Sequence, residues 1–407
     1  MTDPSSPHRF RVKGATAEDF LEALATRSFF LDWCFRSPAL PNGRELCDLL
    51  VVFDHTAIIW QVKDLKLDEH GRYKAAEVQK NFRQLSGAFR QLFELKTPVA
   101  LVNARRTTET FDPSRITDVF LISALLGDGE EHFSGFAEVQ ERSVHVFTRG
   151  FTEIVLGELD TISEFVEYLR AKQVLLASKS KSLVLLGGEE NLLGFYLQNN
   201  RSFTRLAEAT DVTIEDGFWT ALQQDPGYRA KKAADRISYA WDSIIERAHE
   251  GSTQYEQVAR ELARPNRFER RVLAQSFYDM HVAAHEDTAH PIARRITVGR
   301  DPVPGRQTTY VFLFIEETGS RDLRREMLHG LCVVARDIYR SNRTVVGIAT
   351  EKRLAPGCSY DFCLLDYPDW PEEMAKAAER LRVEAGFFEN PQRSESSTHE
   401  YPDDARE

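Results

Sequence analysis

The chain has 407 residues, of which 42% are apolar and 28% charged, a profile typical of a soluble protein with two or three domains. No apolar run approaches the roughly 20 residues that cross a bilayer, and the N-terminus lacks a basic start followed by an apolar stretch, so we expect no membrane span and no secretory signal. The five scattered cysteines favour a reducing cytoplasm over a disulfide framework, and the net charge of -11 argues against non-specific coating of nucleic acid without excluding a local basic groove.

The first region begins with a predicted helix over residues 16–33. Thr16-Ala-Glu18-Asp19 forms a capping box, and apolar residues follow at helical spacing. After a loop rich in turn residues, 49–53 and 57–62 are predicted strands. Asp54-His55 lies between them as a two-residue turn, so the pair is predicted to form a hairpin.

A long helix is predicted next, over residues 75–95, because its apolar side chains recur every three or four positions. Further strands are predicted at 98–103, 119–125 and 144–147, and a closing helix at 152–172. The fold class of this first domain, residues 1–177, is therefore α/β, with three layers and a mixed sheet.

The remainder of the chain is predicted to form two further parts and a tail. After a linker at 178–182, residues 183–295 are mixed but mostly helical, with helices at 231–250 and 267–285. Residues 296–388 form a small α/β domain, with strands at 310–315, 345–350 and 361–365 and helices at 321–339 and 372–385. The polar tail, residues 389–407, is expected to be disordered.

Three polar residues stand at one end of the apolar hairpin. If Asp54-His55 is the turn, the count along the strands places Asp48 opposite Gln61, and directly opposed residues share a face about 5 Å apart. Lys63 is two residues beyond Gln61 and so shares that face. The sequence therefore predicts an acid, an amide and an ammonium group at one site.

These groups suit phosphodiester hydrolysis. Asp48 supplies an anionic oxygen for a hard divalent cation, and Gln61 supplies its amide oxygen. Lys63 would stabilise charge on the phosphate or orient the attacking water. A second carboxylate is expected from the first helix, which offers Glu18 and Glu22.

Asp48 followed after twelve residues by Gln61-Val62-Lys63 resembles the PD-(D/E)XK nuclease superfamily, in the Gln-x-Lys variant of Mrr-like restriction endonucleases. Gly14-x-x-x-Glu18 at the start of a helix is similar to the first motif of that group, so the resemblance makes Glu18 the helix carboxylate and Asp48, Gln61 and Glu18 the metal ligands. It implies a restriction-endonuclease-like domain and a Mg²⁺- or Mn²⁺-dependent DNA endonuclease of restriction, repair or defence. The chain departs from the majority pattern at Gln61, which replaces an acid, and at Cys47, where proline is usual.

Other residues are candidates for support of this site. Glu45 precedes Asp48 by three positions, and either faces the site or is an ordinary charged residue at a strand entry. The predicted helix at 75–95 carries Gln79 and Gln84 together with basic residues, which either contact DNA or form a solvated face. From residue 61 to 110 the chain has ten Lys or Arg against six Asp or Glu, a local basic excess of four.

Two alternatives remain open. One is a catalytically inactive nuclease-fold module that binds nucleic acid or a protein partner. The other, weaker one is a zinc hydrolase, because His281 and His285 lie one helical turn apart, although the intervening Glu of His-Glu-x-x-His is absent. Under the nuclease hypothesis, the regions after residue 183 would choose the target or form a homodimer.

Overall fold

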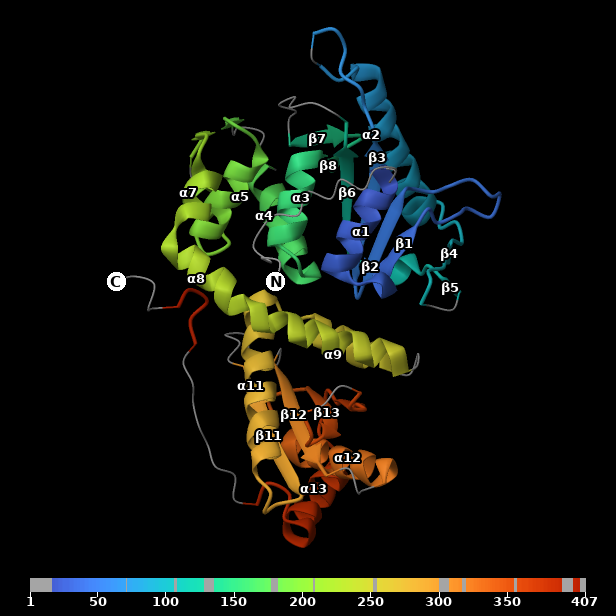
Figure 1. Cartoon of the computed structure of the whole chain (residues 1–407). Coiled ribbons are helices and arrows are strands. Elements are labelled where there is room, and N and C mark those ends of the chain that lie inside the picture. Colours follow the sequence, from blue (N-terminus) through green and yellow to red (C-terminus); the bar gives the residue numbers. More distant parts are fainter. Residues whose placement is uncertain are drawn as a thin grey trace. The chain divides into compact units, whose positions relative to one another are not determined.

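The computed structural model describes residues 17–402, apart from 71, 106–107, 128–134, 177–181, 208, 252–254, 300–306, 317–319, 355–356 and 390–397. The chain divides into two compact units, residues 1–222 and 223–407 (Figure 1). The sequence instead predicts boundaries near 177, 183 and 296, so the unit boundary falls inside its predicted middle region. Within the described residues, no helix is both long enough and apolar enough to cross a membrane.

A six-stranded mixed sheet forms the centre of the first unit, in the order β1-β2-β3-β6-β8-β7. Strand β3 pairs with β6, and β6 with β8, in parallel, whereas the other pairs are antiparallel. This confirms the mixed α/β class. The strands are β1 (Cys34–Arg36), β2 (Leu49–Phe53), β3 (Thr56–Lys63), β6 (Asp118–Leu125), β7 (Phe136–Val139) and β8 (Arg142–Thr148).

Helices cover both faces of this sheet (Figure 1). On one face, Phe165 stacks on Trp60 at 5.8 Å between ring centroids and lies 5.2 Å from Phe29. On the other face, Phe82 and Leu85 share a core with strand residues that include Ile59. The helices of the first face are α1 (Ala17–Phe29), α3 (Arg149–Glu158) and α4 (Ile162–Leu176), and that of the second is α2 (Ala75–Phe89), which continues as the π-helical turn η2 (Arg90–Glu94).

Three predicted elements of this unit differ from the structure: the first helix, which ends at Phe29 and not at residue 33, the strand at 98–103 and the helix at 152–172. The predicted strand at 98–103 contributes only β4 (Ala100–Leu101), which pairs with β5 (Glu109–Thr110) outside the main sheet. Val102 there is 53% exposed, so one face of the apolar run is open to solvent. The predicted helix at 152–172 is two helices. The first ends at Glu158 with Leu159 as its C-cap, and the Thr161 hydroxyl accepts the Glu164 N–H at the start of the second.

The first helix begins at Ala17, and the predicted cap residue Thr16 lies outside the described residues. It ends at Phe29 and is followed by the short 3-10 helix η1 (Leu31–Trp33). The expected linker at 178–182 also lies largely outside the described residues. After it come a parallel strand pair and short helices, namely β9 (Ser182–Leu185), α5 (Glu189–Gln198), α6 (Thr204–Ala207), β10 (Asp211–Ile214) and α7 (Phe218–Gln224).

The second unit contains a helical part followed by an α/β part. Its four-stranded sheet has the order β11-β12-β13-β14, and β12 and β13 are parallel because α12 connects them. The helical part has α8 (Pro226–Ala234), η4 (Asp235–Ile237), α9 (Ser238–Gly251), α10 (Glu256–Ala263) and α11 (Arg267–Glu286). The α/β part has β11 (Ile292–Val298), β12 (Thr308–Ile315), α12 (Arg321–Ile338), β13 (Thr344–Glu351), β14 (Asp361–Asp366) and α13 (Glu372–Ala385).

Residues 398–402, which belong to the tail that the sequence predicts to be disordered, contact α11. Arg271 on α11 donates hydrogen bonds to the carbonyl oxygens of His399 and Glu400. Sequence composition alone could not reveal this contact, because Arg271 precedes the segment by more than a hundred residues. The other residues after 389 lie outside the described part of the chain.

Candidate functional site

The β2–β3 hairpin has the predicted register. Phe53 pairs with Thr56 around the Asp54-His55 turn, and the pairing continues to Leu49 opposite Trp60. Asp54 accommodates the turn with a φ of 49°, a backbone conformation that Asp tolerates better than most residues. The Asp48 N–H then donates to the Trp60 carbonyl at 3.2 Å, which extends the ladder by one step. Asp48 therefore lies beside Gln61, as the sequence predicts.

Asp48 and Gln61 are in direct contact. The Gln61 amide nitrogen donates to Oδ2 of Asp48 at 2.5 Å, and the Val62 backbone N–H donates to the same oxygen at 2.5 Å. Because an ionised carboxylate only accepts hydrogen bonds, the NH₂ group of Gln61 faces it and the amide oxygen is directed elsewhere. The hairpin thus fixes both side chains without any help from a ligand.

Asp48 and Gln61 each have one side-chain oxygen that takes no part in this contact. Within the described part of the chain, neither Oδ1 of Asp48 nor Oε1 of Gln61 has a hydrogen-bond partner. Both oxygens remain accessible to solvent. The two residues are only 7% and 6% exposed, and these oxygens are among the few atoms of each side chain that contact solvent. Such oxygens are the ligands that Mg²⁺ and Mn²⁺ prefer.

Lys63 completes the predicted constellation. It ends β3, two residues after Gln61, and therefore lies on the same side of the strand. Its side chain is half-buried, and no hydrogen bond or ion pair holds its ammonium group among the described residues. Its positive charge acts on Asp48 by lowering the pKa of that carboxyl group.

The surroundings of Asp48 make its ionised form costly. Burial raises the pKa of Asp48 to about 6, and the negative charges of Glu45 and, to a smaller extent, Glu18 add to that rise. The Val62 N–H and Lys63 act in the opposite direction. The negative charge of the Asp48 carboxylate is thus only partly balanced by hydrogen-bond donors and positive charges of the protein. Such a surplus of negative charge is expected where a cation is to be bound.

Glu18 does not join Asp48 and Gln61. It lies on α1, where its carboxylate is 3.5 Å from the Arg36 guanidinium. Arg36 also pairs with Asp19 at 2.6 Å and with Glu22 at 2.9 Å. Across the described residues, no three His, Cys, Asp or Glu side chains gather where they could hold a metal. Of the predicted ligands, the structure therefore brings together Asp48 and Gln61, with Glu18 acting only through its charge.

The residues predicted to support the site lie in different surroundings. Glu45 is exposed, and its charge acts on Asp48 more strongly than that of Glu18. Glu22 is held by Arg36. Gln79 and Gln84 lie on the exposed side of α2, away from the buried side that contacts the sheet. Neither glutamine is among the hydrogen-bonded side chains around Asp48.

Sequence reasoning missed two buried polar residues next to Gln61. Asn81 on α2 is fully buried, and its amide nitrogen donates to the Gln61 carbonyl at 3.4 Å, while its own oxygen has no partner. Ser123 on β6 pairs directly with Gln61 and is also fully buried. Asn81 could have been noticed, because it interrupts the apolar stripe of α2 between Val78 and Leu85.

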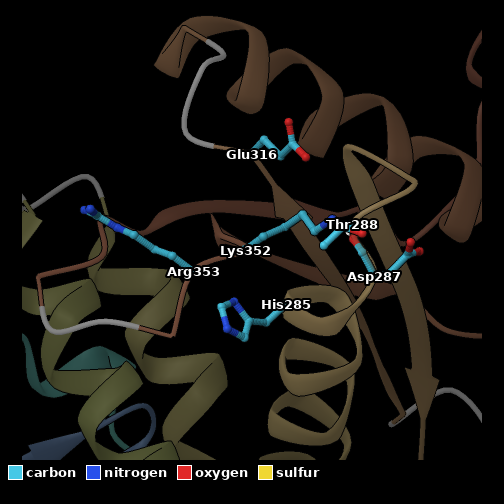
Figure 2. Close-up of a pocket in the computed structure, with 6 residues that line it drawn as sticks. All are labelled: His285, Asp287, Thr288, Glu316, Lys352 and Arg353. Atoms are coloured by element: carbon cyan, nitrogen blue, oxygen red, sulfur yellow. Dashed lines mark hydrogen bonds between the residues drawn. The ribbon is translucent and has the colours of Figure 1, made fainter.

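The histidine pair of the zinc hypothesis lies in the second unit, where its two members have different surroundings. The Nε2 of His281 contacts the Glu351 carbonyl at 2.9 Å, and its ring stacks on Phe314. His285 instead lines an open pocket of about 250 Å³ (Figure 2). The other residues around that pocket are Asp287, Thr288, Glu316, Lys352 and Arg353. His281 is therefore a structural side chain.

In comparisons with known proteins, no family model, no curated protein and no solved structure matches this chain. The chemistry of the site in the first unit therefore follows from its own geometry. That geometry belongs to a mixed α/β unit that places an acid, an amide and an ammonium group at the end of a hairpin.

Proposed function

We propose that the first unit is a restriction-endonuclease-like domain that hydrolyses phosphodiester bonds of DNA with the help of a divalent metal ion. The proposal is carried by the contact between Asp48 and Gln61 across the hairpin, with Lys63 two residues further on. The combination agrees with the resemblance of the same residues to the Gln-x-Lys variant of PD-(D/E)XK nucleases.

The donor set fits Mg²⁺ or Mn²⁺. Asp48 and Gln61 each offer one oxygen that has no other partner among the described residues, and Mg²⁺ is commonly held by one or two protein oxygens with waters and substrate phosphate in the other positions. When bound, the metal ion would polarise the phosphate and activate a water molecule. The Glu45 carboxylate nearby adds negative charge that favours a cation.

The protein's own groups have separate roles in this proposal. Val62 and Gln61 hold the Asp48 carboxylate in a fixed orientation, so no reorganisation is needed when the site is occupied. The Lys63 ammonium group stabilises negative charge that develops on the phosphate. Asn81 supports the strand from the α2 side through the Gln61 carbonyl.

DNA as the substrate is supported by the charge around the site. The exposed side of α2 carries Lys80 and Arg83, and Arg90 follows at the start of η2. This segment has a net basic excess although the whole chain is acidic. Basic side chains on one helix face are suited to contacts with a phosphate backbone, which position the duplex without reading its sequence.

Cleavage of supercoiled plasmid with Mg²⁺ or Mn²⁺ tests the proposal. We expect Asp48→Ala and Lys63→Ala to reduce the nicking rate about 100-fold or more, because each removes a group that acts on the reacting phosphate. Asp64→Ala is the matched control, since Asp64 is an exposed acid directly after the same strand. Equal rates for the wild type and Asp48→Ala would contradict the proposal. Mn²⁺ should also raise the melting temperature of the wild type but not of Asp48→Ala.

The inactive module is the second candidate, and one observation favours it. Gln61 contributes no charge, and the Glu18 carboxylate is already held by Arg36. A module of this kind would bind DNA or a protein partner without cutting. DNA binding that persists in Asp48→Ala, together with absence of cleavage by the wild type, would support it over the nuclease.

A further inference from the structure

The described C-terminal segment, residues 398–402, contacts the Arg271 guanidinium of the second unit. Arg271 donates through Nη2 to the His399 carbonyl at 2.6 Å. It also donates through Nη1 and Nη2 to the Glu400 carbonyl, at 3.2 Å each. Two consecutive main-chain carbonyls are thus bound by the fork of one arginine, whose geometry is suited to paired acceptors.

The surface that receives the segment has its own internal support. The Asp235 carboxylate, 3% exposed, accepts from Arg271 at 3.0 Å and from Lys231 at 2.6 Å. The Arg271 guanidinium also lies over the Phe268 ring at 4.8 Å. Because these contacts come from α8, η4 and α11 and not from the tail, both cations remain oriented when the tail leaves.

The same surface favours an acidic side chain. Lys231 and Arg271 share Asp235, and Lys231 also lies 3.5 Å from the Glu400 carboxylate. The next residue, Tyr401, packs over Gly227 at the start of α8, where a Cβ atom would lie 3.8 Å from its ring. The surface therefore recognises main-chain carbonyls, one carboxylate and one aromatic ring in sequence.

We propose that this surface, formed by Lys231, Asp235 and Arg271 and called here the tail site, is a peptide-binding site for the acidic C-terminal segment of this chain. The chain's own residues 398–402 occupy it within one molecule. The same segment, presented by a second copy, occupies it when the resident segment is weakened. This inference concerns the second unit and does not depend on the nuclease proposal.

A labelled peptide of residues 394–407, added to the full chain, tests the tail site by fluorescence anisotropy. The resident segment competes at an effective concentration in the millimolar range, so the wild-type chain should bind the peptide weakly. In the Glu400→Lys chain, the resident segment loses its contact with Lys231, and we expect the wild-type peptide to bind about 10-fold more tightly than to the wild-type chain.

Two comparisons separate recognition from a change in folding. On the Glu400→Lys chain, a peptide that itself carries Glu400→Lys should bind about 10-fold more weakly than the wild-type peptide, since only the probe differs. Adding Arg271→Lys to that chain should weaken binding of the wild-type peptide, because the fork is lost while the charge remains. Arg264→Lys, at a 50% exposed position, is the matched control and should have no effect. Absence of saturable binding to the Glu400→Lys chain, or equal affinity for both peptides, would overturn the proposal.

Discussion

Two buried carboxylates of this chain have opposite electrostatic surroundings. Burial and the nearby acids raise the pKa of Asp48 to about 6. Glu351, at the end of β13, receives hydrogen bonds from Arg324 and from the backbone and hydroxyl of Ser359, which lower its pKa to about 2 against the effect of burial. The first carboxylate is left short of positive partners and suits a ligand site, whereas the second is fully compensated and suits a structural role.

Glu351→Gln should destabilise the protein in a pH-dependent way. The pKa of Glu351 in the folded state is about 2, below its ordinary value of 4.5, so its contribution is fully present above that ordinary value and is lost as pH falls towards 2. At pH 7 we expect the free energy of unfolding to fall by about 3 kcal/mol. Urea denaturation of both proteins at several pH values measures the difference.

The difference between the wild type and Glu351→Gln should narrow as pH falls below 4.5. Glu316→Gln is the matched control, because Glu316 is an exposed acid just after the neighbouring strand β12, and its difference from the wild type should stay small throughout. A Glu351→Gln difference that stays constant from pH 7 to pH 3 would show that the ionised carboxylate is not what Arg324 stabilises.

At the level of elements, the sequence predicts the hairpin and α2 correctly because their patterns are local. The turn at Asp54-His55 and the apolar strands on either side set the register, and that register alone brings Asp48 to Gln61. The role of Asn81 is not local, since its partner is a carbonyl on another element. The same holds for Glu18, whose attachment to Arg36 depends on how α1 packs beside β1.

Gly135 is the point where three elements of the first unit meet. It precedes β7, and its carbonyl accepts a hydrogen bond from Lys172 of α4 at 2.6 Å. Lys172 also pairs with Glu189 of α5 at 2.5 Å, and Tyr168 donates to the same carboxylate. A Cβ atom on Gly135 would lie 2.3 Å from the buried Oε2 of Glu189. Because Lys172, Tyr168 and Glu189 are all buried, the Glu189 carboxylate cannot swing into solvent to make room for a methyl group.

Gly135→Ala should therefore destabilise the first unit by about 1–3 kcal/mol, the usual cost of overpacking a buried position. Gly87→Ala is the contrasting control, because Gly87 lies within α2 with open space at its Cβ position. That change should be neutral or stabilising by up to about 1 kcal/mol. Urea denaturation of the wild type, Gly135→Ala and Gly87→Ala measures these differences in stability. Equal midpoints for the wild type and Gly135→Ala would refute the steric argument.

For the whole molecule, the boundary between the two compact units lies inside the middle region that the sequence predicts at 183–295. Residues 182–222 belong with the first unit, where Tyr196 packs on Tyr168 at 5.2 Å and Glu189 pairs with Lys172. The strands β9 and β10 that organise this segment are four residues each and lie more than twenty residues apart in the chain. The residues of β10 alternate between exposed and buried over only four positions, and Leu183-Val-Leu185 of β9 is a continuous apolar run, so only the packed structure reveals the pair.

Each unit has its own apolar core, and this predicts two unfolding transitions. One core lies between α2 and the six-stranded sheet, and the other between α12, α13 and the four-stranded sheet. Because Gly135 belongs to the first unit and Glu351 to the second, Gly135→Ala should lower only one transition temperature in calorimetry, and Glu351→Gln only the other. Hydrogen exchange of peptides from each unit assigns the transitions. A single transition that both substitutions shift equally would mean that the two cores unfold as one cooperative body.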